Sequence, residues 1–267
     1  MKVLHIWNTA GVGSIIAKYM DRLFGTESLV VYRRAFDRYG VTTYGELWDC
    51  GAKMFTLKCL LKVRKFDIVH IHSFDKIVPL VKLFYPKKPI VLHYHGSDIR
   101  GKWSLRRKYW SKANALIYST LDLADNETPK HAIYMPNPVD TEVFYPSAVK
   151  STPKTAFHVS YNADDVALKY AQQYNLKLTI YDRTKNGGIP HSKFPKILCQ
   201  YEYYIDVKRD AAGILLKVPL SKTALEALAC NLKVITWNGR IIEGLPSQNL
   251  PENVARQIFA IYSKISN

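Results

Sequence analysis

The stretch SKTALEALACNLKVI, Ser221–Ile235, joins a polar helix start, a small apolar helix interrupted by Glu226, a stop and a β-branched strand. Ser221, Lys222 and Thr223 offer two hydroxyls, an ammonium group and unpaired backbone N–H groups where the helix dipole favours an anion. Glu226 follows one turn later, within reach of a sugar hydroxyl. The pattern predicts a phosphate-binding helix start beside a carboxylate.

The same residues also allow a purely structural interpretation. Thr223 and Glu226 have the spacing of a capping box, in which the glutamate folds back onto the start of its own helix. This alternative stays open, because the spacing is common in helices of any function.

Short apolar segments alternate with helical patterns through the rest of the chain. Apolar residues at helical spacing predict helices, and the alternation predicts an α/β fold with parallel sheets. The predicted strands are Lys2–Trp7, Ser28–Tyr32, Asp67–His72, Pro89–Tyr94, Ala115–Ser119, His131–Met135, Ala156–Tyr161, Leu176–Tyr181 and Glu202–Val207. The predicted helices are Ser14–Phe24, Gly51–Arg64, Lys76–Phe84, Ser104–Ala113 and Asp164–Tyr174.

A proline-rich connector divides this pattern into two parts. The segment MPNPVDTEVFYP, Met135–Pro146, forbids a continuing helix or a central strand. We therefore expect an N-terminal domain over residues 1–146, a smaller C-terminal domain over 147–250, and a cleft between them. An amphipathic pattern over Glu252–Ser266 predicts that the last segment, 251–267, is a helix that docks on the body of the protein.

Charge and cysteine usage restrict the class of function. The chain has 38 basic and 22 acidic residues, and this excess attracts phosphate groups. Its four cysteines form no C-x-x-C pair, which is typical of a reducing, cytoplasmic protein. No apolar run approaches the roughly 18–20 residues that span a bilayer, so we expect any membrane contact to be peripheral, on the inner face.

One basic segment is a candidate for that contact. KWSLRRKYWSK, Lys102–Lys112, places Trp103, Arg107 and Trp110 on one helical face, which suits an anionic membrane or a phosphorylated lipid. The alternative is a solvated face with the tryptophans turned into the core. A nucleic-acid partner is not expected, because the chain has no recognised nucleic-acid module.

Five motifs in this order resemble the B-fold glycosyltransferases of the family 4 (group 1) type. They are Gly11-Val12-Gly13, DIVHIHSF at Asp67–Phe74, HYHGSD at His93–Asp98, the connector, and ALEALACNLKVI at Ala224–Ile235. The resemblance implies two Rossmann-like domains, a nucleotide-diphosphate sugar as donor, most often a UDP-sugar, and a glycan or lipid-linked acceptor. It also implies sugar transfer with retained configuration and without a metal or another cofactor.

The resemblance also implies roles for individual residues. Glu226 matches a glutamate that binds the donor ribose, and Gly11 and Gly13 match a loop that approaches the donor closely. His95 matches a histidine near the transferred sugar, with Asp98 one short turn away. The implied donor-binding residues are Gly11, Gly13, Ser221, Lys222, Thr223 and Glu226, and the implied catalytic residues are His95 and Asp98.

The chain departs from that family at two positions. Val218 stands eight residues before Glu226, where the family has a second glutamate. The family's arginine and lysine pair after the first strand of the second domain is also absent, and Lys208 and Arg209 are the nearest substitutes. The alternative function is therefore a catalytically impaired module that binds nucleotide sugars.

Three other classes fit the residues less well. His70, His72, His93 and His95 could hold zinc, but i, i+2 histidines usually just share a strand face and no cysteine or carboxylate completes the set, so no metal is expected. Ile16 replaces the third glycine of a dinucleotide fingerprint, which disfavours a dehydrogenase. A nucleotide-sugar epimerase is disfavoured because the chain is short and lacks an evident pair of carboxylates.

Overall fold

The computed structural model describes residues 1–148 and 151–266 and divides into two compact units. The first unit combines Met1–Pro138 with the C-terminal segment that starts at Pro251, and the second unit is Val139–Leu250. The boundary falls at Pro138 rather than at residue 146, because Val139 and Phe144 are buried in the core of the second unit. Residues 149 and 150 of the expected second domain lie outside the described residues.

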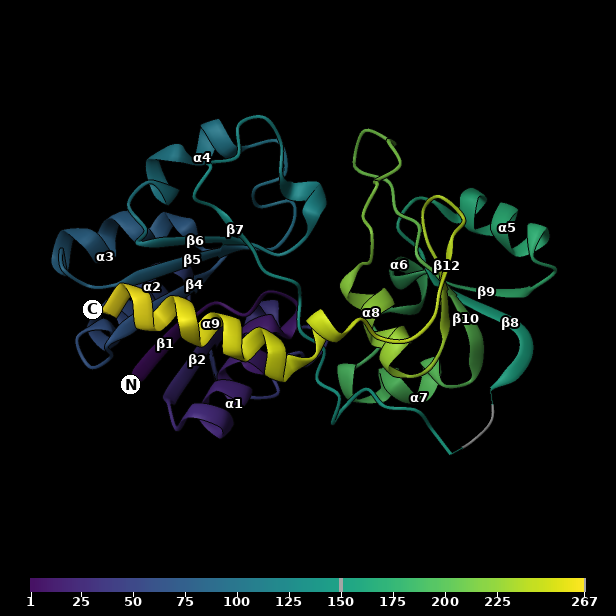
Figure 1. Ribbon diagram of the computed structural model, residues 1–267, viewed down its shortest axis with the longest axis horizontal. Coiled ribbons are helices and arrows are strands. Elements are labelled where there is room, and N and C mark those ends of the chain that lie inside the picture. The colour runs from purple at the N-terminus through teal and green to yellow at the C-terminus, as the bar shows by residue number, and fades with distance from the viewer. Residues whose placement is uncertain (149–150, 267) are drawn as a thin grey trace. The chain divides into compact units, whose positions relative to one another are not determined.

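The first unit contains a seven-stranded parallel sheet in the order β3-β2-β1-β4-β5-β6-β7 (Figure 1). Its strands are β1 (Lys2–Ile6), β2 (Glu27–Arg33), β3 (Glu46–Trp48), β4 (Ile68–His72), β5 (Ile90–Tyr94), β6 (Ala115–Tyr118) and β7 (Ile133–Tyr134). Single 3-10 turns cover Thr9–Gly11, Arg34–Phe36, Asp75–Ile77 and Leu121–Leu123. The central strands β4 and β5 are buried at every position, as expected for a parallel sheet covered on both faces.

Helices cover both faces of this first sheet. One face packs against α2 (Ala52–Val63), α3 (Val78–Phe84) and α4 (Trp103–Trp110). The other face packs against α1 (Val12–Phe24) and α9 (Pro251–Ser266), which contact each other (Figure 1). The C-terminal helix α9 thus belongs to the core of the first unit, through Val254, Ile258 and Tyr262.

The second unit is a five-stranded sheet in the order β12-β11-β10-β8-β9, parallel except for β12. Its strands are β8 (Thr152–Val159), β9 (Lys177–Tyr181), β10 (Tyr201–Ile205), β11 (Lys233–Ile235) and β12 (Ile241–Ile242). Its helices are α5 (Asp164–Gln173), α6 (Arg183–Asn186), α7 (Phe194–Leu198) and α8 (Lys222–Ala229), with 3-10 turns at His191–Lys193 and Ser247–Asn249. One face packs against α7 and α8 and the other against α5.

The predicted α/β alternation is confirmed in both units. Two strands were not predicted: β3 and β12 are only three and two residues long and lie at sheet edges. Such short segments show too little periodicity to be recognised. Because parallel strands end at a common edge, the polar segments that follow β1, β4 and β5 lie together in the first unit, and those that follow β8, β9 and β10 lie together in the second.

Candidate functional site

The start of α8 is fixed by a buried carboxylate. Ser221 is the N-cap, and its Oγ accepts a hydrogen bond from the backbone N–H of Ala224 at 3.2 Å. Asp206, which follows β10, accepts from the Ser221 N–H at 2.8 Å and from its hydroxyl at 2.7 Å. The Ser221 hydroxyl is thus used within the protein, so an anion at this helix start would rely on the backbone of the first turn and on Lys222.

Glu226 does not form the capping box. The N-cap is Ser221, so Thr223 already lies inside the helix. The buried Glu226 carboxylate instead lies 3.1 Å from Lys222 Nζ and 3.8 Å from His191 Nε2. Burial by itself would raise the pKa of Glu226, but Lys222 and His191 outweigh it and hold that pKa below its ordinary value. Glu226 is therefore an ionised, positioned acceptor; His191 was not predicted, because no sequence spacing links it to this helix.

Cations gather where β8, β9 and β10 end. The Tyr161 ring lies 4.2 Å from the Arg183 guanidinium carbon and 4.4 Å from Lys208 Nζ, measured to the ring centre. These are cation–π distances. Arg183 was missed by sequence reasoning, although a basic residue two positions after the predicted strand Leu176–Tyr181 was the available signal. Arg183 and Lys208 thus bring positive charge to Tyr161, which follows β8, the first strand of the unit. The resembled family has an arginine and a lysine after that strand, and this chain lacks them there.

Arg209 has a different environment from Lys208. Its guanidinium binds the Asp165 carboxylate through two nitrogens, at 2.5 and 2.8 Å, and donates to the carbonyl of Asn162 at 3.1 Å. The hydrogen bonds from Arg209 lower the pKa of Asp165. Arg209 therefore ties the loop after β10 to the first turn of α5, and its charge is already compensated.

In the first unit, the glycine loop after β1 is closely packed by the protein itself. Gly11 has φ +76°, and a Cβ built on it would lie 3.0 Å from the Val41 carbonyl oxygen. A Cβ on Gly13 would lie 3.1 Å from Asn8 Oδ1 and 3.2 Å from His72 Nε2. The left-handed conformation of Gly11 thus favours glycine independently of any ligand, and a side chain at Gly13 would press on Asn8 and His72.

His95 and Asp98 form one loop after β5. The Asp98 carboxylate accepts from the backbone N–H groups of His95, at 3.0 Å, and of Gly96, at 2.6 Å. Burial lowers the pKa of His95 to about 4, against an opposing effect of Asp98, so its imidazole is neutral near pH 7. Asp98 thus shapes the loop, whereas the His95 ring has its Nδ1 buried and its Nε2 at 3.0 Å from His72 Nδ1.

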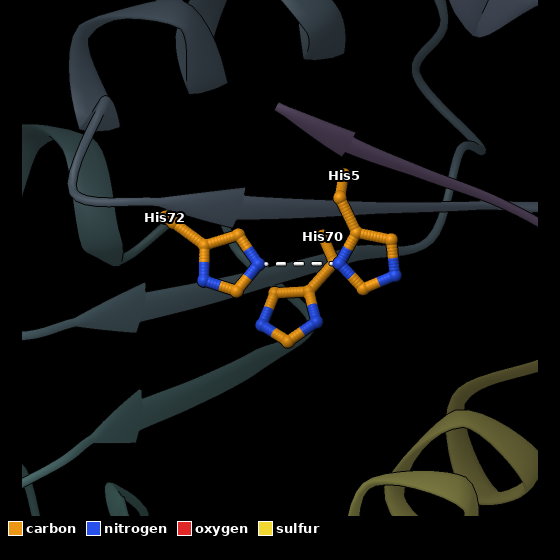
Figure 2. A group of neighbouring side chains, drawn as sticks. All are labelled: His5, His70 and His72. Atoms are coloured by element: carbon orange, nitrogen blue, oxygen red, sulfur yellow. Dashed lines mark hydrogen bonds between the residues drawn. The ribbon is translucent and has the colours of Figure 1, made fainter. Parts of the chain in front are cut away.

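His95 belongs to a cluster of five histidines, which we call the imidazole cluster: His5 on β1, His70 and His72 on β4, His93 on β5, and His95. His5 pairs in register with His70, and His72 with His93, so their rings share the face covered by α1 and α9. Figure 2 shows the His5 and His72 rings joined by a 3.2 Å contact, from His5 Nδ1 to His72 Nε2. His72 Nδ1 lies 3.0 Å from His95 Nε2. His5 was not among the histidines considered from the sequence, because only strand register places it there.

The tryptophans of Lys102–Lys112 point inward, contrary to the predicted membrane face. Trp103 is fully buried and its Nε1 donates to the Leu123 carbonyl oxygen, while Trp110 Nε1 donates to the Trp103 carbonyl oxygen. Their indole N–H groups need partners that the interior supplies. Arg107 and Lys108 remain exposed. Among the described residues, no helix is long and apolar enough to cross a membrane.

Comparison with known proteins identifies the architecture. No protein-family model and no curated protein matches the sequence. The fold is similar to UDP-GlcNAc 2-epimerase from Neisseria meningitidis bound to UDP-GlcNAc, with TM-score 0.52, 13% identity, and 100% of this chain and 94% of that chain covered. A UDP-N-acetylglucosamine 2-epimerase from Rickettsia bellii gives TM-score 0.50 at 13% identity, with 100% and 97% covered. A sucrose-phosphate synthase from Thermosynechococcus elongatus gives TM-score 0.50 at 12% identity, with 100% and 90% covered. The predicted fold of two Rossmann-like units is confirmed: the chain has the glycosyltransferase B fold.

Proposed function

We propose that this protein is a glycosyltransferase that moves a sugar from a nucleotide-diphosphate sugar, most simply a UDP-sugar, to an acceptor hydroxyl. The observation that carries the proposal is Glu226, a buried and ionised carboxylate one turn into a helix that starts at the strand edge of the second unit. Such a carboxylate can accept hydrogen bonds from the two ribose hydroxyls. Its ion pair with Lys222 holds the carboxylate in place, and the carboxylate oxygens can still accept further hydrogen bonds.

The diphosphate would be bound by fixed dipoles and cations. The first turn of α8 offers backbone N–H groups, and Lys222, Lys208 and Arg183 bring positive charge to the same strand edge. When the bond between the anomeric carbon and the diphosphate oxygen breaks, these groups stabilise the negative charge that develops on the leaving phosphate. Sugar transfer on this basis needs no metal at the diphosphate, and a retaining, family 4-like reaction is the form we propose.

His95 is the proposed catalytic residue of the first unit. Its neutral imidazole would bond a hydroxyl of the transferred sugar in exchange for its contact with His72, and Asp98 positions it by holding the backbone of its loop. Gly11 and Gly13 keep the neighbouring loop compact, so that backbone groups after β1 can approach the donor.

Binding and turnover are tested separately. We expect UDP to raise the unfolding temperature of the protein, and Glu226→Gln to weaken UDP binding about 10-fold, the effect of removing one charged hydrogen-bond partner. Glu243→Gln is the matched control, because Glu243 is an exposed carboxylate next to Lys233. Equal affinities of both variants for UDP would reject the assignment of Glu226.

A second candidate function rests on Val218. This residue cannot bind sugar hydroxyls in the way that the family's first glutamate does, so the chain could bind nucleotide sugars without transferring them. UDP release from a panel of UDP-sugars, with and without glycan and lipid acceptors, separates the two functions. If UDP-sugars bind but UDP is released with none of the sugars and acceptors, the protein is a nucleotide-sugar-binding module rather than a transferase.

We propose further that the first unit binds the acceptor, and that the protein is cytoplasmic and attaches to the inner face of an anionic membrane. Helices α2, α3 and α4 cover one face of the first sheet, and α3 contacts both α2 and α4. The outer surfaces of these helices carry exposed apolar side chains among basic ones. The apolar residues are Met54, Leu57, Leu61, Leu80, Leu83, Phe84 and Leu105, and the exposed basic ones include Lys53, Lys58, Lys65, Arg107 and Lys108. A lipid-linked acceptor would be presented to this surface.

Vesicle cosedimentation tests that surface. Replacing both Arg107 and Lys108 by Gln should weaken binding to phosphatidylglycerol vesicles about 30-fold at low salt, at about 1 kcal/mol per basic residue. The matched control replaces Lys169 and Lys177, two exposed lysines of the second unit. Equal binding to neutral and anionic vesicles would exclude the electrostatic part of the proposal.

A further inference from the structure

The imidazole cluster contains more buried polar atoms than its own hydrogen bonds satisfy. Among the described residues, His5 Nε2, His70 Nε2 and both ring nitrogens of His93 are buried and have no hydrogen-bond partner. A buried polar atom without a partner costs about 1–3 kcal/mol. Such atoms call for an explanation, and a ligand at His70 Nε2 would satisfy one of them.

The rings are in the form that binds metal ions. Burial holds the pKa of His70 and of His72 well below the ordinary value, with the neighbouring imidazoles acting in the same direction, and it lowers the pKa of His5 to about 4. A neutral imidazole has one N–H group and one lone pair, and the lone pair is the metal ligand.

The positions of the nitrogens fit one ion. His5, His70 and His72 each offer one ring nitrogen such that all three lie within 4.8 Å of one another (Figure 2). His5 Nδ1 and His72 Nε2 are 3.2 Å apart. Two nitrogens at about 2.0–2.1 Å from a tetrahedral zinc ion lie about 3.3–3.4 Å apart, so the observed spacing needs little adjustment.

Outer partners orient two of the three rings. The Tyr262 hydroxyl on α9 lies 2.6 Å from His70 Nδ1, and His95 Nε2 lies 3.0 Å from His72 Nδ1. Metal-ligating histidines characteristically donate a hydrogen bond from their second nitrogen to such a partner, and with Nδ1 of His70 and of His72 as donors both Nε2 atoms would be left for the metal. The absence of a side chain at Gly13 keeps space at His72 Nε2, because a Cβ there would lie 3.2 Å from that atom.

We propose that His5, His70 and His72 bind one divalent transition-metal ion, with Zn²⁺ the ion best suited to three neutral imidazoles. A second group, His72, His93 and His95, shares His72. The first group is favoured because all three of its rings are fully buried. The ion would join β1 to β4 beneath α1 and α9, directly below the glycine loop and His95. This site is independent of donor binding by the second unit.

Metal binding is tested on the full chain, purified with a chelator and then titrated with Zn²⁺ and, separately, with Co²⁺. We expect one equivalent of Zn²⁺, a higher unfolding temperature with zinc, and the intense visible absorption of four-coordinate Co²⁺. His5→Leu should abolish these signals. His93→Leu, in the neighbouring group, and His131→Leu, at an exposed position, are matched controls that should retain one equivalent.

Two further measurements apply even if His5→Leu does not fold. X-ray absorption of the zinc-loaded wild type should show three imidazole nitrogens at about 2.0–2.1 Å. Tyr262→Phe should weaken zinc binding about 10–100-fold, because it removes the outer partner of His70 and leaves the ligands in place. The proposal is overturned by a wild type without a bound equivalent, by an oxygen-only coordination shell, or by a loss of the ion in His93→Leu but not in His5→Leu. UDP binding should be unaffected by His5→Leu, so donor binding and metal binding can fail separately.

Discussion

The carboxyl ends of the strands differ in kind between the two sheets. In the first unit they carry neutral imidazoles that contact one another and are sealed by α1 and α9. In the second unit they carry acidic and basic side chains: Asp206 and Glu226 are buried, and Lys222, Lys208 and Arg183 follow the same strands. The same α/β architecture therefore provides an edge with a cluster of neutral imidazoles in one unit and an edge that can bind an anion in the other. A diphosphate is thus expected on the second unit.

The substitution Lys222→Met tests this contrast between the two sheets and should have the largest effect. At pH 7 the variant leaves Glu226 buried and ionised without the Lys222 ammonium, which should destabilise the second unit by about 3 kcal/mol. The pKa of Glu226 is lowered in the folded wild type, so its stabilising effect is present above the unfolded pKa and is lost as pH falls through the folded one. In the variant, burial raises the pKa of Glu226, so its carboxyl group takes up a proton as the pH falls. The neutral carboxyl group then needs no cation beside it.

The stability difference between Lys222→Met and the wild type should therefore shrink from pH 7 to pH 4. Urea unfolding at both values measures it, with Lys177→Met, an exposed lysine of the same unit, as the control. A difference that is the same at both pH values would show that Lys222 acts through packing rather than through the charge of Glu226.

A finer test separates two arginines of the second unit. Arg183→Gln removes a cation beside Tyr161 and should weaken UDP binding about 10-fold. Arg209→Gln removes a guanidinium that Asp165 already neutralises, so it should change UDP affinity much less. Isothermal titration of UDP into both variants decides the matter, and equal losses would mean that net charge, rather than position, determines affinity.

The fold was predictable because alternating strands and helices leave a clear period in the sequence. Candidate site residues could be proposed from the sequence only where they are neighbours in the chain, as at Ser221 and Glu226. His5 and His191 reach their sites through strand register and loop packing, which no local spacing records. The inward turn of Trp103 was missed for a related reason: an amphipathic helix does not reveal from its sequence whether its aromatic face meets the core or a membrane.

The smallest expected effect tests how compact the edge of the first unit is. Gly13→Ala lies within α1, where alanine is intrinsically better than glycine by about 1 kcal/mol. The new Cβ would, however, meet Asn8 Oδ1 and His72 Nε2 at 3.1 and 3.2 Å. Neither neighbour can move easily, because Asn8 bonds Ser14 and His72 contacts other histidines through both ring nitrogens. Overpacking of about 1–3 kcal/mol should then leave a net loss of about 1 kcal/mol in urea unfolding.

Gly96→Ala is the matched control for Gly13→Ala, because a Cβ at Gly96 meets nothing within 4 Å. It should change the free energy of unfolding by less than about 0.5 kcal/mol. If Gly13→Ala instead stabilises the protein, the helix propensity term dominates and the edge of the first unit yields to an added methyl group. The imidazole cluster would then be loose enough to rearrange around the methyl group. Close packing of its rings would no longer distinguish the edge of the first sheet from the edge of the second.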